Sequence, residues 1–210
     1  MRQNPARRMA LLDAAIEVLA RDGSRGLTFR AVDAEAAVPT GTTSNYFANR
    51  PDLLGQVTQR TRERLTPVES EVAELMRAPR DRALVTRLMR DILGRMRRDR
   101  SSYLAMLELR LEGTRRPELR AALTEVFSAN LRDSIEFHVG AELPGDRTTP
   151  LLLYLAMSGL LVDELTVPDV LSPYPLDRLI ADMVDRILPP GPPATPTRSP
   201  APPNAAVGRE

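Results

Sequence analysis

Hydrophobic residues recur along this chain at intervals of three and four, and no segment alternates in the manner of a half-buried strand. The pattern therefore predicts an all-α protein. We expect helices over residues 5–23, 28–36, 39–46, 49–65, 68–76, 80–98, 101–113, 117–139, 149–165 and 175–188. Short polar, proline or glycine joints separate them.

Residue types that begin and end helices mark several of these boundaries. Asn4 and Pro5 suit the N-cap and first position of the first helix, and Gly23 ends it. Thr28 suits the cap of the second helix, and Asn49 begins the fourth.

The composition excludes several classes of protein. The chain has no cysteine and one histidine, so disulfides, thiolate metal sites and cysteine nucleophiles are excluded. We find no spacing typical of metal ligands, no nucleophile paired with a base and no phosphate-binding loop, and we expect neither an enzyme nor a cofactor. The start of the chain lacks the apolar stretch of a signal peptide, and the most apolar run, 151–162, is too short to span a bilayer. A cytoplasmic protein without membrane attachment is expected.

Charge changes this picture only slightly. All 29 basic residues are arginine, which a genome rich in G and C explains. Residues 1–64 hold ten arginines against seven acidic residues, a net charge of +3, and the remainder carries −2. The asymmetry weakly favours a basic N-terminal module.

The predicted helix 39–46 has unusual chemistry, because almost all of its side chains are small and polar. Such a helix has little to bury, so it projects into solvent or into a polar partner. The DNA major groove is such a partner, since asparagine can pair with an adenine edge and threonine offers a hydroxyl and a methyl group to bases. Two short helices joined by a tight turn are also what a helix-turn-helix requires.

At this point the sequence resembles the TetR family of bacterial regulators. The resemblance covers residues 8–54 and rests on anchors at fixed spacing: Gly23, Gly26, Thr28, Val38, Gly41, Thr42, Phe47, Arg50, Leu53 and Leu54. The family pattern usually has glycine where this chain has Ala37, and Leu-Tyr-x-His where it has Thr43-Ser44-Asn45-Tyr46. These departures leave the identity of the base contacts open.

The resemblance implies a set of DNA contacts. Contacts to phosphate, which position the module, are expected from Thr28, Arg30, Tyr46 and Arg50. Contacts to bases, which read the sequence, are expected from Thr40, Thr42, Thr43 and Asn45, and Gly41 would let the backbone approach closely. Thr28 is a helix cap in either case. Arg50 is alternatively only a solvated residue at a helix start, although the helix dipole disfavours a cation there.

The resemblance also implies a body that binds a ligand and forms a dimer, and the helical pattern suggests residues for both. Asn130 and Ser134 fall within the apolar arc of 117–139, where another helix or a ligand must satisfy them. Arg110 falls within the arc of 101–113, where it either pairs with Asp163 or Glu164 or meets an acidic ligand. The predicted ligand site comprises Tyr103, Met106, Arg110, Phe127, Asn130 and Ser134. His138 lies at the edge of its arc and is interpreted as partly exposed.

The helix 149–165 is apolar on most of its circumference and must be covered on all sides. The family's usual solution is a four-helix bundle that this helix and the helix 175–188 form with their mates in a homodimer. An intrachain core is the alternative.

We therefore expect three parts: a helix-turn-helix DNA-binding domain over 1–50, a ligand-binding and dimerisation domain over 51–188, and a disordered tail over 189–210, which holds eight of the 19 prolines. The function expected is a repressor that binds a palindromic double-stranded DNA operator as a dimer and is released by a small-molecule effector. An activator, a regulator that answers no ligand, and a helical interaction module without DNA binding are the alternatives.

Overall fold

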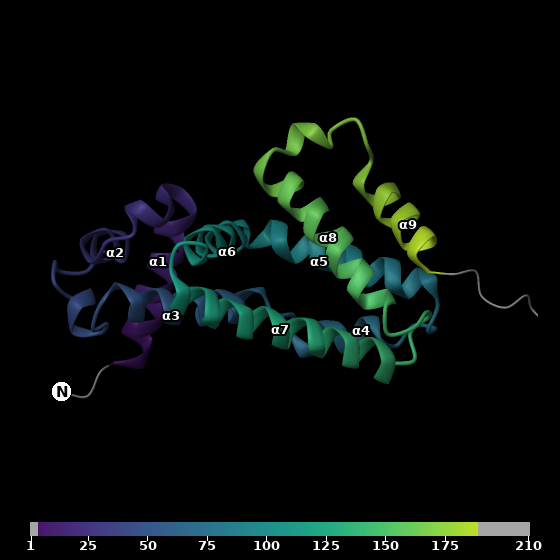
Figure 1. Ribbon diagram of the computed structural model, residues 1–210, viewed down its shortest axis with the longest axis horizontal. Helices are drawn as coiled ribbons and strands as arrows, with labels where there is room; N and C mark the ends of the chain where they lie inside the picture. Colours follow the sequence, from purple (N-terminus) through teal and green to yellow (C-terminus); the bar gives the residue numbers. More distant parts are fainter. Residues whose placement is uncertain (1–3, 189–210) are drawn as a thin grey trace, which may run out of the picture.

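The computed structural model describes residues 4–188, and the regular elements within this range are all helices. Figure 1 shows an elongated molecule with α1 and α2 at one end and the paired α8 and α9 toward the other. The elements are α1 (Pro5–Gly26), α2 (Phe29–Glu35), η1 (Thr43–Asn45), α3 (Arg50–Leu65), α4 (Glu69–Leu75), α5 (Arg82–Arg98), α6 (Arg100–Gly113), α7 (Pro117–Gly140), α8 (Thr149–Thr166), η2 (Pro168–Val170) and α9 (Leu176–Ile187). The all-α prediction is confirmed, and the predicted tail over 189–210 lies outside the described residues.

The predicted helix caps are confirmed. The Asn4 side chain accepts hydrogen bonds from the backbone amides at the start of α1, and Thr28 and Asn49 do the same for α2 and α3. Gly23 interrupts α1 with a φ of 69°, but helical structure resumes and continues to Gly26. The glycine therefore bends the end of α1 rather than terminating it.

One cluster of buried side chains joins the N-terminal module to the body. It combines residues of α1, α2 and α3 with Ala105, Met106 and Leu109 of α6 and with Leu119 and Leu123 of α7. Because α1 packs along α6, the module and the body share this core.

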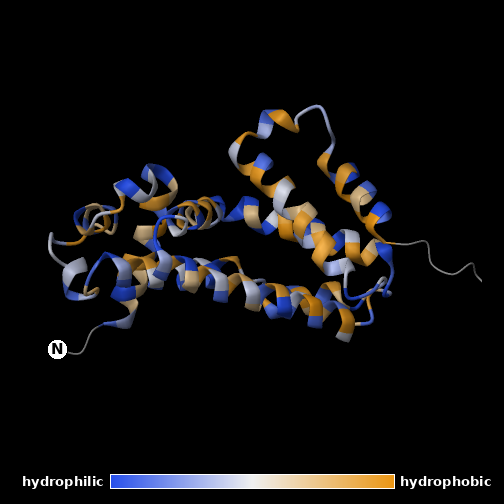
Figure 2. Cartoon of the chain, viewed as in Figure 1, coloured by the Kyte–Doolittle hydropathy of each residue, from blue (hydrophilic) through white to orange (hydrophobic). Residues whose placement is uncertain are grey.

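Two further clusters hold the rest of the body together. Both are built from α5, α8 and α9, with Ile180 and Val184 of α9 completely buried. Figure 2 shows hydrophobic residues along most of α8. The other face of α8 remains uncovered, since Leu152, Leu155 and Val162 are exposed.

The length and composition of α8 are sufficient for a membrane span, although the run 151–162 alone is shorter than that. In the structure this helix packs against α5, α7 and α9, and 39% of its apolar window is buried. A single helix of this kind is weak evidence for a membrane.

His138 differs from its sequence interpretation. It is buried, with 4% of its surface exposed, and its Nε2 lies 3.0 Å from the carbonyl oxygen of Pro144 in the loop after α7. The prediction of a partly exposed histidine was wrong, because this loop folds back over the ring. Burial lowers the pKa of His138, although the hydrogen bond to Pro144 opposes the shift.

Candidate nucleic-acid interface and its junction with the body

The segment after α2 begins with a left-handed turn. Ala37 has a φ of 51°, a backbone conformation that glycine adopts without cost and that other residues rarely adopt. This geometry explains why the family pattern has glycine there. The turn is closed by hydrogen bonds from the Ala37 amide to Ala34 and from the Val38 amide to Asp33.

The predicted α-helix over 39–46 is wrong. Only Thr43–Asn45 is helical, and it is a single 3₁₀ turn, preceded by Gly41 with a φ of 92°. Hydroxyl groups bond to nearby carbonyls, from Thr42 to Pro39 at 2.5 Å and from Ser44 to Gly41 at 2.7 Å. Such local side-chain bonds compete with the helical ladder, which the sequence pattern did not take into account.

Most of the predicted DNA-contacting residues lie on the surface. Thr28, Arg30, Thr40, Gly41 and Asn45 are exposed, and Thr42 and Tyr46 are half-buried. Ser44, which the resemblance did not place among the base contacts, is also exposed. A Cβ atom added to Gly41 would meet no atom within 4 Å, so its backbone is open toward the outside.

The predicted contact between Thr43 and a base is wrong. Its side chain is completely buried and its Oγ1 donates a hydrogen bond to the Asp33 carboxylate at 2.5 Å. A residue enclosed in this way cannot reach a base without unfolding the segment. The 3₁₀ geometry turns Thr43 inward and leaves its neighbours outward.

The predicted contact between Arg50 and a phosphate is wrong. Its guanidinium donates to the carbonyl oxygens of Ser24 and Leu27 and, at 3.0 Å, to the Ser24 hydroxyl. These carbonyls lie at the C-terminal end of α1, where the helix dipole attracts a cation. Burial lowers the pKa of Arg50, and the nearby Glu112 carboxylate opposes this. The residue joins α3 to α1 instead of projecting toward DNA.

The predicted ligand site is only partly brought together. The Arg110 guanidinium lies 4.8 Å from the centre of the Phe127 ring, in a contact between α6 and α7. Arg110 itself is exposed, and the carboxylate predicted as its alternative partner, Glu164, binds Arg97 at 2.8 Å. The predicted ion pair with Glu164 was therefore wrong.

The other members of that site are dispersed. Met106 is buried in the shared core, and Tyr103 is half-buried against the α5, α8 and α9 cluster. Asn130 is exposed, and Ser134 donates to the Asn130 carbonyl at 2.8 Å. The expectation that Asn130 occupies the middle of a buried face was wrong, because this part of α7 faces solvent in the single chain.

A groove of about 290 Å³ lies elsewhere, between α3 and α7. Its lining includes none of the six predicted ligand residues and consists of Gly55, Thr58, Gln59, Arg62, Ala122, Glu125, Val126 and Ala129. The small side chains at 55, 122 and 129 leave this space between the helices. Residues 4–188 contain no group of three or more histidine, aspartate or glutamate side chains that could hold a metal ion.

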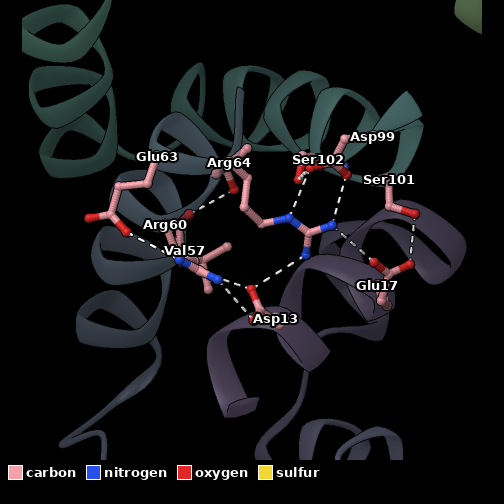
Figure 3. Close-up of polar contacts among 10 residues, drawn as sticks. Asp13, Glu17, Val57, Arg60, Glu63, Arg64, Asp99, Ser101 and Ser102 are labelled. Carbon is pink, nitrogen blue, oxygen red and sulfur yellow. Dashed lines mark hydrogen bonds and ion pairs between the residues drawn. The ribbon is translucent and has the colours of Figure 1, made fainter. Parts of the chain in front are cut away.

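The junction between module and body is a polar network centred on Arg64 at the end of α3 (Figure 3). Its guanidinium binds both carboxylate oxygens of Asp99, at 2.9 and 2.8 Å, and lies 3.4 Å from Asp13 and 3.7 Å from Glu17 of α1. Ser101 of α6 closes the network by donating to Glu17 at 2.7 Å. Three helices therefore meet at one arginine.

Asp99 has two functions in this network. It also caps α6, accepting from the Ser102 amide at 3.2 Å and the Ser102 hydroxyl at 2.8 Å. Burial alone would raise the pKa of Asp99, but the hydrogen bonds from Arg64 and Ser102 lower it below its usual value. The carboxylate is thus held ionised at the point where α6 begins.

A second link joins α6 to the bend in α1. The Ser24 amide, directly after Gly23, donates to the Glu108 carboxylate at 3.1 Å. Ser24 also accepts from Arg50 through its carbonyl and hydroxyl oxygens. The end of α1 is therefore fixed from α6 and from α3 together.

Comparison with known proteins agrees with this architecture. Residues 11–57 match the family described as bacterial regulatory proteins, tetR family, and residues 80–190 match the tetracyclin repressor-like C-terminal domain. None of the curated protein sequences matches this chain.

Several solved structures are similar over nearly the whole chain. The multidrug binding protein EbrR complexed with imidazole is 28% identical, with 90% of this chain and 99% of that chain covered and a TM-score of 0.63. The same protein complexed with ethidium gives 28% identity, 87% and 99% coverage and a TM-score of 0.60. A TetR-family member from Streptomyces coelicolor A3 is 28% identical, with 88% and 99% coverage and a TM-score of 0.62. With its N-terminal helix-turn-helix and its C-terminal helical domain both matched, the chain belongs to the TetR family of transcriptional regulators.

Proposed function

We propose that this regulator is a repressor that binds a palindromic DNA operator as a homodimer in the cytoplasm and is released by a small-molecule effector. The observation that carries the proposal is the polar segment 40–45, which exposes Thr40, Gly41, Ser44 and Asn45 at the end of a module that shares its core with α6. No catalytic step is part of this function, and the boundaries proposed for its two domains are 1–50 and 51–188.

The surface of the module supports two kinds of DNA contact. Base edges would be read by Thr40, Thr42 and Asn45, with the Gly41 backbone close to the groove. Phosphates would be bound by Thr28, Arg30 and Tyr46, which are exposed or half-buried near the same segment. Arg50 and Thr43 have no part in this surface.

The uncovered face of α8 supports a homodimer. Leu152, Leu155, Gly159 and Val162 recur at the spacing of one helix face and are exposed in the single chain. A Cβ atom added to Gly159 would meet nothing within 4 Å, so another helix could approach closely there. The same face of a second copy, beside α9, would cover this stripe and relate two DNA-binding modules by a two-fold axis.

The junction at Arg64 supports a response to ligand. A ligand that binds the body more tightly in one position of α6 than in another would shift α6, and Asp99 and Glu108 would carry the shift to α3 and α1. Binding of ligand and of DNA would then be coupled reciprocally.

Part of the predicted ligand site supports an aromatic effector. The solved EbrR complexes contain imidazole and ethidium, which are both aromatic ring systems. In this chain Phe127 offers an aromatic face beside Arg110, with Met106 and Tyr103 on the same helix, α6. We propose Arg110 and Phe127, which are in contact, as the ligand-facing part of the predicted set.

Selection of duplexes from a randomised DNA library, followed by mobility-shift titration, tests the DNA-binding part. The wild-type chain should enrich a palindromic sequence. Asn45→Ala should relax the sequence preference, whereas Arg30→Ala should weaken all sequences about equally and reduce the salt dependence by about one phosphate contact. Enrichment of no sequence by the wild-type chain would favour a helical interaction module and refute the proposal.

A transcription assay on the selected sequence separates the remaining alternatives. A repressor lowers transcription from a promoter that contains the sequence, and an activator raises it. Ethidium and imidazole serve as the first effector probes. If neither they nor a broader panel of aromatic compounds changes DNA affinity, the ligand-responsive part of the proposal is wrong.

A further inference from the structure

Asp33 of α2 is a carboxylate almost completely enclosed by protein. Only 2% of its surface is exposed. One carboxylate oxygen accepts from the Gly41 amide at 2.7 Å, and the other accepts from the Thr43 amide at 2.7 Å and the Thr43 hydroxyl at 2.5 Å. Within residues 4–188, no basic side chain forms an ion pair with it.

A buried carboxylate is costly unless hydrogen bonds compensate for its lost hydration. Here three donors do so, and all of them come from the short segment after the turn. Short bonds between N–H groups and a carboxylate are among the stronger hydrogen bonds in proteins. If the segment moved away while Asp33 stayed buried, the carboxylate would lose all three donors, and this cost holds the segment in place.

The same residue also fixes the start of the segment. The backbone carbonyl of Asp33 accepts from the Val38 amide at 3.0 Å, so one residue binds the chain at positions 38, 41 and 43. Gly41 has the positive φ with which its amide points toward the carboxylate. The conformation of the whole segment is set from its inner side.

The exposed residues lie next to the positions that Asp33 binds, which are called anchors below. Thr40 precedes the anchor at Gly41, and Ser44 and Asn45 follow the anchor at Thr43; all three are exposed. Their positions relative to α2 depend on the anchors, because the segment contains only one 3₁₀ turn and no regular helix of its own. Loss of an anchor would leave them on a loose loop.

We propose that Asp33 is a positioning residue for DNA recognition, which holds Thr40, Thr42 and Asn45 in the arrangement that reads bases. The inference rests on the proposed DNA-binding function. Asp33 does not touch DNA itself. It makes the affinity for the preferred sequence depend on a carboxylate buried beneath the recognition surface.

The test compares Asp33→Asn, which replaces one acceptor oxygen by an amide group that cannot accept, with the milder Thr43→Val and Thr43→Ser. The matched control is Thr61→Val, since Thr61 is equally buried but its hydroxyl bonds to Val57 within α3. Amide hydrogen exchange is measured on each full chain without DNA. Affinity is measured for the duplex that the wild-type chain selects and for a scrambled duplex of the same length.

We expect Asp33→Asn to accelerate exchange at Gly41 and Thr43 and to weaken binding of the selected duplex by about tenfold or more, with a much smaller effect on the scrambled duplex. Thr43→Val should show part of both effects. Thr43→Ser keeps the hydroxyl that donates to Asp33 and should behave like the wild type. Thr61→Val should lower stability without changing either readout.

Two results would overturn this inference and leave the proposed function intact. One is that the amides of Gly41 and Thr43 exchange at the wild-type rate in both the Asp33→Asn and the Thr43→Val variants. The other is an unchanged ratio of selected to scrambled affinity in a Thr43→Val chain that is folded. If the wild-type chain selects no duplex, the proposed function fails first, and the role of Asp33 in recognition fails with it.

Discussion

The guanidinium of Arg64 binds both carboxylate oxygens of Asp99, and this contact joins the last turn of α3 to the N-cap residue of α6. Asp99 simultaneously caps α6 through Ser102. A movement of the start of α6 must therefore either displace α3 or break a charged, half-buried pair of hydrogen bonds. The pair thereby ties α6 to α3, and through the contact of Arg64 with Asp13 at 3.4 Å to α1 of the DNA-binding module.

A double-mutant cycle should detect this connection. Arg64→Met and Asp99→Asn, alone and together, are expected to give a coupling energy of about 1 kcal/mol or more, because each single change leaves a half-buried charged or polar partner unpaired. Asn at position 99 can still cap α6, which separates the ion pair from the cap. The free energies of unfolding come from urea titration.

The pair of Arg90 on α5 and Asp177 on α9 provides the control cycle, since their side chains are 41% and 84% exposed. A coupling energy below about 0.5 kcal/mol is expected for such a surface pair. Equal coupling in the two cycles would mean that the Arg64 contact is no stronger than an ordinary surface ion pair.

Replacement of Ala37 by glycine should stabilise the protein. The alanine occupies a left-handed conformation, and glycine removes that strain while losing more backbone entropy on folding, for a net gain of roughly 0.5 to 1 kcal/mol. Ala36, its neighbour, has a right-handed φ of −76°, so Ala36→Gly should destabilise the protein. Thermal unfolding of the two variants should therefore shift in opposite directions.

Buried His138 should make stability depend on pH. Its pKa in the folded protein lies below the 6.5 of the unfolded chain, so the unfolded chain binds the proton more readily. The stability that the neutral ring contributes is complete above about pH 6.5 and falls as the pH drops from there toward the lower folded pKa.

Urea titration at about pH 7.5 and pH 5.5 measures this effect. The loss of stability between the two should be smaller in His138→Gln, which keeps a side-chain donor for the Pro144 carbonyl. Asp99 and Glu112 also have lowered pKa values, but carboxylates titrate below this range. An identical pH dependence in wild type and variant would assign the effect to other groups.

A charge on the uncovered face of α8 should prevent dimer formation. Leu155 is 57% exposed in the single chain, and Leu155→Glu would place a carboxylate in the centre of the proposed interface. Sedimentation velocity should show a dimer for wild type and a monomer for the variant. Leu111→Glu, at a leucine of similar exposure on α6, should remain dimeric. A wild-type monomer at micromolar concentration would contradict the proposed assembly.

The helices of this protein could be predicted from sequence because each depends on local information. Apolar spacing located the long helices, and Asn4, Thr28 and Asn49 marked three starts that the structure confirms. The 3₁₀ segment could not be predicted in this way. Its conformation depends on Asp33, ten residues before Thr43, and an aspartate within an amphipathic helix normally lies on the solvent side.

The same reason explains the errors at the candidate sites. Arg50 was expected to need DNA as a partner for its charge, but the end of α1, 26 residues earlier, supplies carbonyl oxygens. Arg110 was placed within an apolar arc, yet an aromatic face on α7 provides its contact without burial. Spacing along one helix gives the side on which a residue lies, and it does not identify the partner from another helix.

The contact between Arg50 and α1 has an uneven sensitivity to mutation. Two of its acceptors are main-chain carbonyls, which every amino acid carries, so no substitution at position 24 or 27 can remove them. The donor side, in contrast, depends on one arginine, because lysine lacks the forked geometry that reaches two carbonyls. In an evolving population, position 50 therefore carries the constraint for the joint, and positions 24 and 27 are free to vary as far as this contact is concerned.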